Sequence, residues 1–181
     1  MSDIPTLQTE RLQLVPFDER HFDDYAAMLA DPDSTRFVGS GEPLDRMNAW
    51  RSMAMLLGHW ALRGHGMWAL ERKADHAFIG RVGLLRPEGW PGVELGWMLM
   101  RQHRHHGYAT EASQAALDFA WNQLKLPRVI SLIRKGDDPS LGLVQRLHGE
   151  RVEETDFLGS PTSVFAYYPP AQGHERLAAH G

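Results

Sequence analysis

The stretch with the clearest chemical signature covers residues 104–112, which read RHHGYATEA and follow an apolar, strand-like run. A helix that begins at a glycine-containing turn presents unpaired backbone N–H groups and the positive end of its dipole, which suits phosphate or pyrophosphate. Arg101, Arg104, His105 and His106 add positive potential at the same place. We therefore expect a local anion-binding site at this junction.

The composition of the chain limits the classes of protein to which it can belong. Its 181 residues are 43% hydrophobic, enough for one core, and its formal net charge is −4 with a pI near 6.2. This balance favours neither nucleic acid nor a membrane as a partner. The absence of cysteine excludes disulfides, thiolate metal sites and a cysteine nucleophile. With no leader pattern and no run near the roughly 20 apolar residues of a membrane span, we expect a cytoplasmic protein.

Apolar periodicity divides the chain into strands and helices. Patterns of period two predict strands over residues 11–17, 67–72, 78–86, 93–100, 128–134, 151–158 and 162–168. Patterns of helical period predict helices over residues 18–31, 44–62, about 107–126 and about 139–147. Polar or Pro- and Gly-rich turns separate these elements.

The order of these elements predicts an α/β (α+β) fold. A strand, a helix and a second strand, at 93–100, 107–126 and 128–134, form a parallel βαβ crossover within an otherwise antiparallel sheet. We expect about seven strands and about four helices, in a single domain over residues 1–168. Residues 169–181 lack an apolar period and are expected to form a flexible tail.

Three ordered motifs are similar to those of the GCN5-related N-acetyltransferase (GNAT) family, and specifically of its ribosomal-protein-alanine branch. They are TERLQL at residues 9–14, ELGWML at residues 94–99, and RHHGYATEA. In the last, Arg104, Gly107 and Ala109 meet the family signature of Arg or Gln, two residues, Gly, one residue, then Gly or Ala. The resemblance covers nearly the whole chain and implies that acetyl-CoA lies where the two parallel strands splay.

The resemblance assigns the cofactor contacts to three places along the chain. The end of the first parallel strand would bind the pantetheine amides, the loop and first helical turn would hold the pyrophosphate, and the next helix start would contribute polar groups. The residues concerned are Met98, Leu99, Met100, Arg104, His105, His106, Gly107, Tyr108, Ala109, Thr110, Asp137 and Ser140. Gly107 lets a phosphate approach the backbone because it lacks a Cβ.

Three positions depart from the family pattern. His105 replaces a frequent glycine, so an imidazole or a differently placed amide would form that part of the cradle. Asp137 replaces a frequent asparagine and cannot donate hydrogen bonds, unless Ser140 supplies the donor. Val144 lies where many members have a tyrosine that protonates the departing thiolate, so another group, water or no acid serves here.

Acetyl transfer requires a neutral amine, so we expect a base. Glu94, on the strand beside the thioester, is the candidate and would relay the proton through water; the alternative is a strand carboxylate paired with an arginine. Glu111 is interpreted as a helix-start or packing residue, because the helix dipole favours a carboxylate there but a pyrophosphate opposes it. Without a cysteine, direct transfer in a ternary complex is favoured over a covalent acyl-enzyme.

We expect no metal site, because His103, His105 and His106 lack a fourth ligand at usable spacing and the chain has no HExxH motif. The tryptophans are expected to belong mainly to the core. Trp50 and Trp90 are the two that we expect at a substrate cleft, since they lie near the presumed substrate-side helix and loop.

The resulting expectation is an acetyl-CoA-dependent N-acetyltransferase whose partners are acetyl-CoA and a primary amine, either a protein N-terminal α-amine or a small molecule. An α-amine needs less help than a lysine, because reference pKa values near 8 and 10.4 leave roughly one in ten and fewer than one in a thousand neutral at pH 7. The alternative from another class is a non-catalytic acyl-CoA-binding sensor or interaction module. The sequence leaves open a monomer or a homodimer, and no motif identifies the amine.

Overall fold

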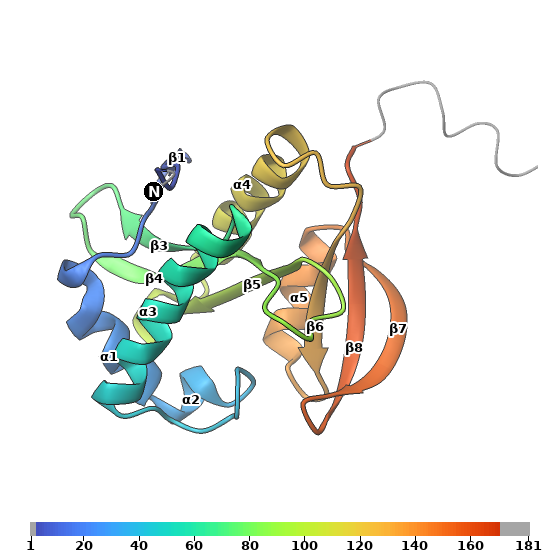
Figure 1. Ribbon diagram of the computed structural model, residues 1–181, viewed down its shortest axis with the longest axis horizontal. Coiled ribbons are helices and arrows are strands. Elements are labelled where there is room, and N and C mark those ends of the chain that lie inside the picture. Colours follow the sequence, from blue (N-terminus) through green and yellow to red (C-terminus); the bar gives the residue numbers. More distant parts are fainter. Residues whose placement is uncertain (1–2, 171–181) are drawn as a thin grey trace, which may run out of the picture.

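A mixed β-sheet forms the centre of the computed structural model, which describes residues 3–170 (Figure 1). Within this range the sheet has eight strands in the order β1-β2-β3-β4-β5-β6-β8-β7. Their bounds are Leu7–Gln8 (β1), Leu12–Val15 (β2), Met67–Arg72 (β3), Phe78–Leu85 (β4), Glu94–Leu99 (β5), Val129–Arg134 (β6), Glu150–Phe157 (β7) and Ser160–Tyr167 (β8). The seven predicted strands are confirmed, and the two-residue β1 is added beside β2.

The helices of the described residues include the four that were predicted and one more. They are Phe22–Ala30 (α1), Pro32–Thr35 (α2), Arg46–Arg63 (α3), Tyr108–Asn122 (α4) and Asp138–Arg146 (α5), with short 3-10 turns at Glu19–His21 and Arg101–His103. The short α2 lies in the segment expected to be a loop. Asp31 follows the end of α1, but its side chain also accepts a hydrogen bond from the Asp33 amide, and Pro32 occupies the first position of α2. The Asp-Pro pair that stops one helix therefore starts the next.

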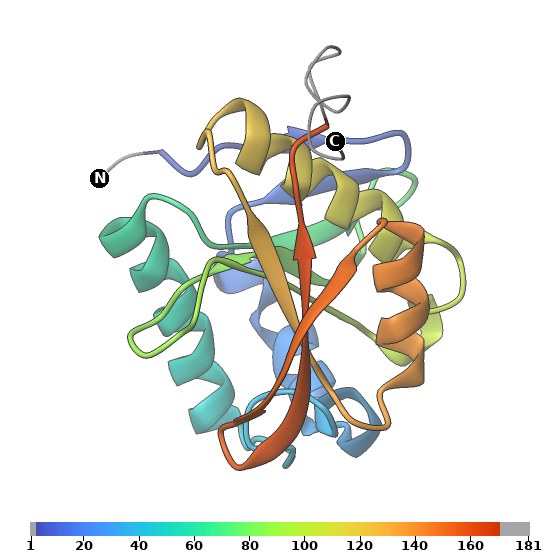
Figure 2. The same ribbon diagram turned by 90° about the vertical axis from the view of Figure 1, so that its right-hand side faces the viewer.

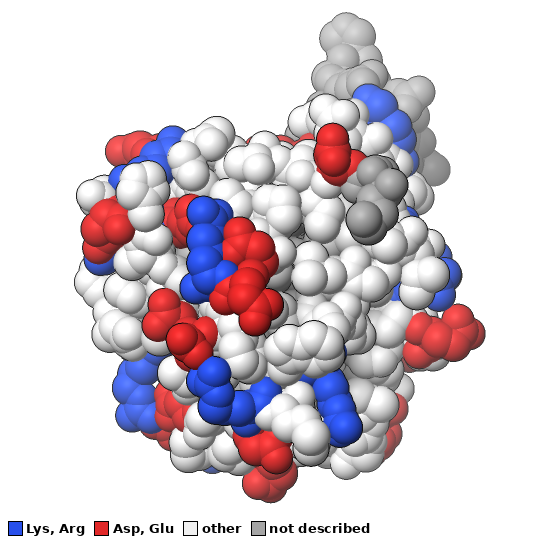
Figure 3. Space-filling view, turned by 60° about the vertical axis from the view of Figure 1, so that its left-hand side comes forward, with Lys and Arg blue, Asp and Glu red and all other residues white. Residues whose placement is uncertain are grey.

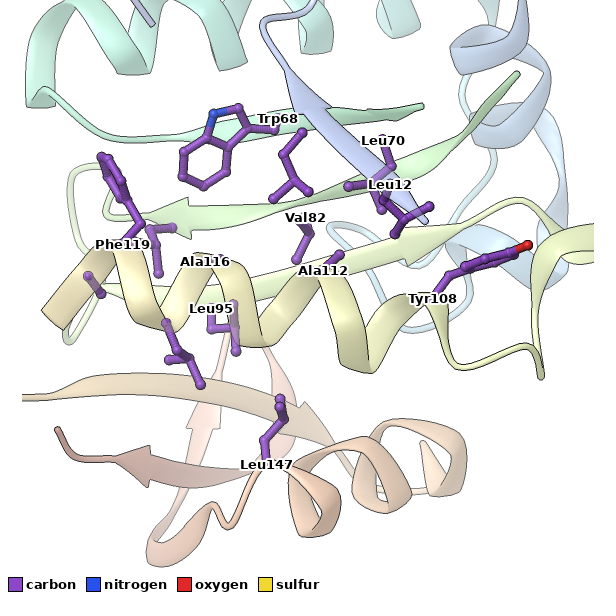
Figure 4. Packing of buried hydrophobic residues seen from close by; sticks show 14 of the residues in the cluster. Leu12, Trp68, Leu70, Val82, Leu95, Tyr108, Ala112, Ala116, Phe119 and Leu147 are labelled. Carbon is purple, nitrogen blue, oxygen red and sulfur yellow. The ribbon is translucent and has the colours of Figure 1, made fainter. Parts of the chain in front are cut away.

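The helices cover the two faces of the sheet. Figures 1 and 2 show α1 and α3 on one face and α4 and α5 on the other. On the α4 face, Ala112 and Ala116 are fully buried, and these small side chains let the helix pack closely against the strands near Val82 and Leu95 (Figure 4). The opposite face packs α1 and α3 against the strands in a second cluster that includes Tyr25.

The predicted βαβ crossover is present. β5, α4 and β6 follow one another, and β5 and β6 are the one parallel pair among the described strands. The two strands share a single pair of residues, Glu94 and Ile130, and then diverge (Figure 1). Beyond this pair, Ser131 Oγ donates to the Leu95 carbonyl (2.8 Å), and Tyr167 Oη donates to Ser131 Oγ (3.1 Å). Side-chain hydrogen bonds therefore replace the backbone ladder where it ends.

The bounds of α4 differ from the prediction for a conformational reason. The helix begins at Tyr108, because Gly107 is its cap and has a left-handed conformation with φ of +81°. It ends at Asn122, and the chain then turns through Lys125, which is also left-handed with φ of +54°. Most of the expected C-terminal tail, residues 171–181, lies outside the described residues.

The surface carries charges of both signs. On the face shown in Figure 3, basic and acidic side chains lie close together and form no extended patch of one sign. Some of the surface charges are paired, as Arg46 is with Asp23 at 2.7 Å, and exposed pairs of this kind contribute little to stability. None of the helices in the described part of the chain combines the length and apolar character of a membrane span.

Glu111, in the first turn of α4, ties the N-terminal motif to this helix. Its carboxylate accepts hydrogen bonds from Thr9 Oγ1 (2.6 Å) and Arg11 N (2.8 Å) and pairs with Arg11 Nε (2.7 Å). Arg11 also donates to the His106 carbonyl (2.9 Å) and lies over the Tyr108 ring. Burial raises the pKa of Glu111, but these hydrogen bonds outweigh burial and bring the pKa below its ordinary value. The interpretation of Glu111 as a helix-start residue is confirmed.

We expect Glu111→Gln to lower the free energy of unfolding by about 1 kcal/mol near neutral pH, because it removes a charge-assisted pair whose Arg11 side chain is partly exposed. The depressed pKa of Glu111 gives stability that is full above its unfolded value and is lost as the pH falls through the folded value. Urea unfolding at about pH 7 and about pH 3 measures this difference, which should shrink in acid. Asp118→Asn, at an exposed position of α4, is the control, with a change below about 0.5 kcal/mol. An equal loss at both pH values would contradict the assignment.

Candidate active site

A cleft of about 300 Å³ lies where β5 and β6 diverge. Its walls come from the segment between α2 and α3, from α3, from β4, β5 and β6, and from the start of α5. The turn between β7 and β8 borders it through Phe157 and Leu158. Of the predicted site residues, the structure brings Glu94, Asp137 and Ser140 together in the lining of this cleft.

The hydrogen bonds of β5 show which of its backbone groups face the gap. The N–H of Met100 donates to a carbonyl of β4 (3.0 Å), whereas the carbonyls of Val93 and Leu95 accept hydrogen bonds from β6. Alternate residues of a strand direct their backbone groups to opposite neighbours. Even-numbered residues of β5 therefore face β4, and odd-numbered residues face β6.

This alternation corrects two of the predicted backbone contacts. Met98 and Met100 direct their backbone groups to β4, so they do not offer them to a ligand in the gap. Leu99 has the required direction, although its carbonyl already accepts a hydrogen bond from Arg104 Nε (3.2 Å). Trp97, which was not predicted, lies beyond the last β6 pair and directs both of its backbone groups into the gap. The sequence did not indicate it, because the direction follows from the register with β4.

The start of α4 has the features of an anion cradle. Gly107 is the cap, and in the described structure no side chain caps the amides of residues 108–110. A Cβ on Gly107 would lie 3.4 Å from Arg11 Nη2, so the glycine keeps the approach to these amides open. His105 is also left-handed, with φ of +63°, which explains why a glycine is frequent at its position in the family that the sequence resembles.

The two predicted loop arginines hold α2 against the loop. Arg104 Nη2 donates to Ser34 Oγ (2.7 Å), and its Nε bonds the end of β5. Arg101 pairs with Asp31 (2.7 Å) and Asp33 (2.6 Å). Both guanidinium groups thus contribute positive charge beside the cradle while their hydrogen bonds are used within the fold. Among the described residues, no group of three His, Asp or Glu side chains could hold a metal ion.

Two other arginines lie at the cradle itself. Arg11 donates to the carbonyl of His106, and Arg146 on α5 donates from Nε to Thr110 Oγ1 (3.1 Å) in the first turn of α4. His106 Nδ1 bonds the carbonyl of Arg104 (2.6 Å). Arg146 reaches α4 from another helix, so no local sequence signal indicates it, whereas Arg11 belongs to the TERLQL motif.

The start of α5 carries the two predicted polar residues. Asp137 caps this helix, because its side chain accepts a hydrogen bond from the Ser140 amide (3.3 Å). Part of the hydrogen-bonding capacity of Asp137 is therefore used within the fold. Val144, at the position of the family's tyrosine, is fully buried in the core, so α5 offers no proton donor to the cleft at this position.

Glu94 lies at the closed end of the gap. Its Oε2 accepts a hydrogen bond from Trp90 Nε1 (2.6 Å), and its carboxylate also accepts one from the Leu132 amide of β6. Burial raises the pKa of Glu94 above its ordinary value, and these hydrogen bonds and the charge of Arg81 offset only part of the rise. Within residues 3–170 its partners are an indole and an amide, and not an arginine at ion-pair distance. A carboxyl of this kind in a cleft is suited to accept a proton.

The two tryptophans expected at the cleft have different positions. Trp90 lines the cleft and packs edge-on against Phe157, with ring centroids 5.0 Å apart, so this prediction is confirmed. Trp50 is 51% exposed on α3 and is not part of the lining, so the corresponding prediction is wrong. Helical spacing places Trp50 on α3 but does not say which face of α3 meets the cleft.

Comparison with known proteins identifies the family. Residues 11–150 match the acetyltransferase (GNAT) domain, and the chain therefore belongs to the GNAT family. It is 31% identical to an acetyltransferase from Agrobacterium tumefaciens str. C58, with a TM-score of 0.80 over 93% of this chain and 97% of that one. It is 27% identical over 144 residues to p20 of Bacillus licheniformis, described as an uncharacterized N-acetyltransferase, over 78% of this chain and 80% of that one.

The fold is also similar to that of RimL, a ribosomal L7/L12 α-N-protein acetyltransferase whose structure contains coenzyme A. The TM-score is 0.76 over 91% of this chain and 98% of that one. The sequence identity is 13%, so this likeness concerns the fold alone.

The two left-handed residues of the loop give opposite expectations for stability. His105→Gly should raise the free energy of unfolding by about 0.5–1 kcal/mol, because a side chain at φ of +63° is strained. Gly107→Ala should lower it by about 1 kcal/mol, because it introduces the same strain at φ of +81°.

Thermal unfolding of these variants measures both effects. His105→Asn is the matched control, since asparagine removes the imidazole but tolerates the left-handed conformation, and its stability should lie between the wild type and His105→Gly. A loss of stability in His105→Gly would show that the imidazole, and not the backbone, determines this position.

Proposed function

We propose that the protein is an N-acetyltransferase that moves the acetyl group of acetyl-CoA to a primary amine by direct attack in a ternary complex. One observation carries this proposal. The gap between β5 and β6 has an uncapped helix start beside its open end and, at its closed end, a carboxylate of raised pKa that lines a cleft. Membership of the GNAT family and the coenzyme A in RimL support the same function.

The described residues fit acetyl-CoA, which supplies the acetyl group as a thioester. The uncapped amides of residues 108–110, with Gly107, His105 and His106 before them, suit the pyrophosphate. Arg11 and Arg146 add positive charge at this point, and Arg104 adds it from the side of β5. The backbone groups of Trp97 and the N–H of Leu99 suit the pantetheine amides, and Ser140 and Asp137 border the cleft opposite them.

In this proposal Glu94 is the base that receives the proton of the amine, through water. Its raised pKa brings its proton affinity closer to that of a group that works near neutral pH. Its hydrogen bonds to Trp90 and Leu132 fix the carboxylate at the fork of the two strands. Because proton removal and thioester binding occur at the same fork, attack and deprotonation are arranged in one place.

The proposed acceptor is an α-amine of a protein N-terminus or a small molecule. An α-amine is neutral far more often than a lysine at neutral pH, so a single carboxylate is sufficient to complete its deprotonation. The likeness in fold to RimL and the TERLQL motif support an N-terminal α-amine, and the cleft volume of about 300 Å³ also admits a small amine.

Release of free CoA thiol tests the proposal. The release should require both acetyl-CoA and an amine, and it should be measured with panels of peptides with free α-amines, polyamines and aminoglycosides. Calorimetry with acetyl-CoA runs in parallel as a measure of binding. Tight binding without thiol release from any amine would instead identify the non-catalytic acyl-CoA-binding sensor.

The role of Glu94 predicts a change in rate and a shift in pH dependence. Glu94→Gln should lower kcat by about 100-fold, because an amide cannot take the proton. In the wild type the acidic limb of kcat/KM should lie above pH 4.5, the ordinary pKa of a glutamate. Trp90→Phe removes an N–H donor that lowers the pKa of Glu94, so it should move this limb to higher pH.

Initial rates between about pH 4 and pH 9 measure both effects. Trp121→Phe is the matched control, because Trp121 lies on α4 outside the cleft, and it should leave the limb in place. An unchanged kcat in Glu94→Gln together with an unmoved limb in Trp90→Phe would assign Glu94 a structural role.

A further inference from the structure

We propose that the acceptor amine also carries a carboxylate, and that Arg81 binds this carboxylate in the same cleft as Glu94. The inference rests on the proposed N-acetyltransferase function and specifies the chemical class of its acceptor. It is argued from four properties of Arg81: its burial, its missing partner, its place in the sheet, and the apolar floor between it and Glu94.

Arg81, on β4, is a buried cation without an anionic partner. It is 8% exposed and lines the cleft. Its Nη1 donates to Tyr25 Oη (3.3 Å), and this hydroxyl is held in turn by Ser52 Oγ (2.9 Å). Its Nε is buried and has no hydrogen-bond partner among the described residues. None of the ion pairs within residues 3–170 includes Arg81.

This arrangement is costly in the free protein. A guanidinium that loses its hydration without gaining a carboxylate leaves a charge uncompensated, and arginines are rarely this deeply buried unless they are paired. The cost is offset when an anion enters the cleft and accepts charge-assisted hydrogen bonds from the guanidinium. Tyr25 and Ser52 hold the side chain in place, so less conformational entropy is lost on binding.

The register of the sheet places Arg81 and Glu94 at the two ends of one floor. Arg81 lies opposite Met98, and Glu94 lies four residues from Met98 on the same face of β5, about 13 Å along the strand. Between them Gly83 lies opposite Gly96, so neither strand raises a side chain there. The long arginine side chain and the glutamate side chain shorten the distance that a ligand has to span.

The floor between the two charged groups is apolar. A Cβ on Gly96 would lie 2.8 Å from Met67 Cε, so this methyl group covers the glycine. Leu85 and Met55 line the cleft beside it. A ligand that fills this space has an amine at the Glu94 end, an aliphatic middle and a carboxylate at the Arg81 end. A free amino acid and a peptide that begins with an acidic residue share this chemistry.

The carboxylate subsite is distinct from the anion cradle of α4. Arg81 shares its face of the sheet with Leu85, which packs against the α1 and α3 cluster, whereas α4 covers the opposite face. A pyrophosphate at the start of α4 therefore does not occupy the position of the substrate carboxylate, and both can be bound at once.

Matched amines test the inference. Glycine, β-alanine and 4-aminobutyrate are compared with ethylamine, propylamine and butylamine, and the peptide Asp-Ala-Ala-amide with Ala-Ala-Ala-amide, by thiol release from acetyl-CoA. In the wild type we expect kcat/KM for at least one carboxylate-bearing amine to exceed that of its neutral match by about 10- to 100-fold. Arg81→Met should reduce this ratio to about one, and Arg81→Lys should retain part of it.

Arg51→Met, which removes an exposed guanidinium from α3, is the control and should keep the wild-type ratio. A second readout does not depend on turnover. In the presence of CoA, calorimetry should show that N-acetyl-4-aminobutyrate or N-acetyl-Asp-Ala-Ala-amide binds more tightly than its neutral counterpart, and that Arg81→Lys weakens this preference. If Arg81→Met does not fold, the lysine variant still decides both readouts.

The outcomes separate this inference from the proposed function. A preference for free amino acids or for the acidic peptide supports the inference and says which source the carboxylate has. Thiol release with a ratio near one for every pair overturns the inference and leaves the acetyltransferase function standing. Carboxylate-selective product binding without any thiol release supports the subsite and overturns the catalytic function, and the absence of both overturns both.

Discussion

The site depends on the divergence of β5 and β6 after a single residue pair. Two strands that separate inside a sheet leave backbone N–H and C=O groups that need other partners. Here Ser131 takes the Leu95 carbonyl, and the carboxylate of Glu94 takes the Leu132 amide. The fork is therefore closed by side chains at its base and left open beyond it, where Trp97 directs its backbone groups into the gap. Because Glu94 stabilises the fork from a buried position, its structural role also raises its pKa.

The sheet separates two anion-binding environments and connects them through β5. The start of α4 lies on one face, with uncapped amides and several arginines, and Arg81 lies on the other face below α1 and α3. The side chains of β5 alternate between these faces, while its backbone borders the gap between them. One strand thus contacts a cofactor through its main chain and an acceptor through its even-numbered side chains. The loop arginines Arg101 and Arg104 are bonded to α2, and they keep this part of the substrate side against the loop.

Local patterns in the sequence predicted most of the fold but only part of the site. Periodicity and caps located the strands, four helices and the crossover, and the loop at residues 104–112 located the helix start. The short α2 was missed because Asp31 and Pro32 serve as a stop and as a start at once. Met98 and Met100 were assigned wrongly because the direction of a backbone group depends on the register with β4, which no single strand contains. Burial of Trp90 against Phe157 and exposure of Trp50 likewise depend on contacts between elements.

The unequal predictability of the two ends of the site has a physical origin. The cofactor end is built from backbone amides, left-handed residues and the contact of Glu111 with Thr9 and Arg11, each of which restricts the residue types at its position. These restrictions make TERLQL and RHHGYATEA recognisable, and the Glu111 contact explains why two motifs a hundred residues apart occur together. At the acceptor end, a buried guanidinium such as Arg81 requires only a compatible anion, and neighbouring glycines require only space. Such a site can change with its substrate while the fork and the cradle remain, so the acceptor has to be inferred from unsatisfied charge and not from a motif.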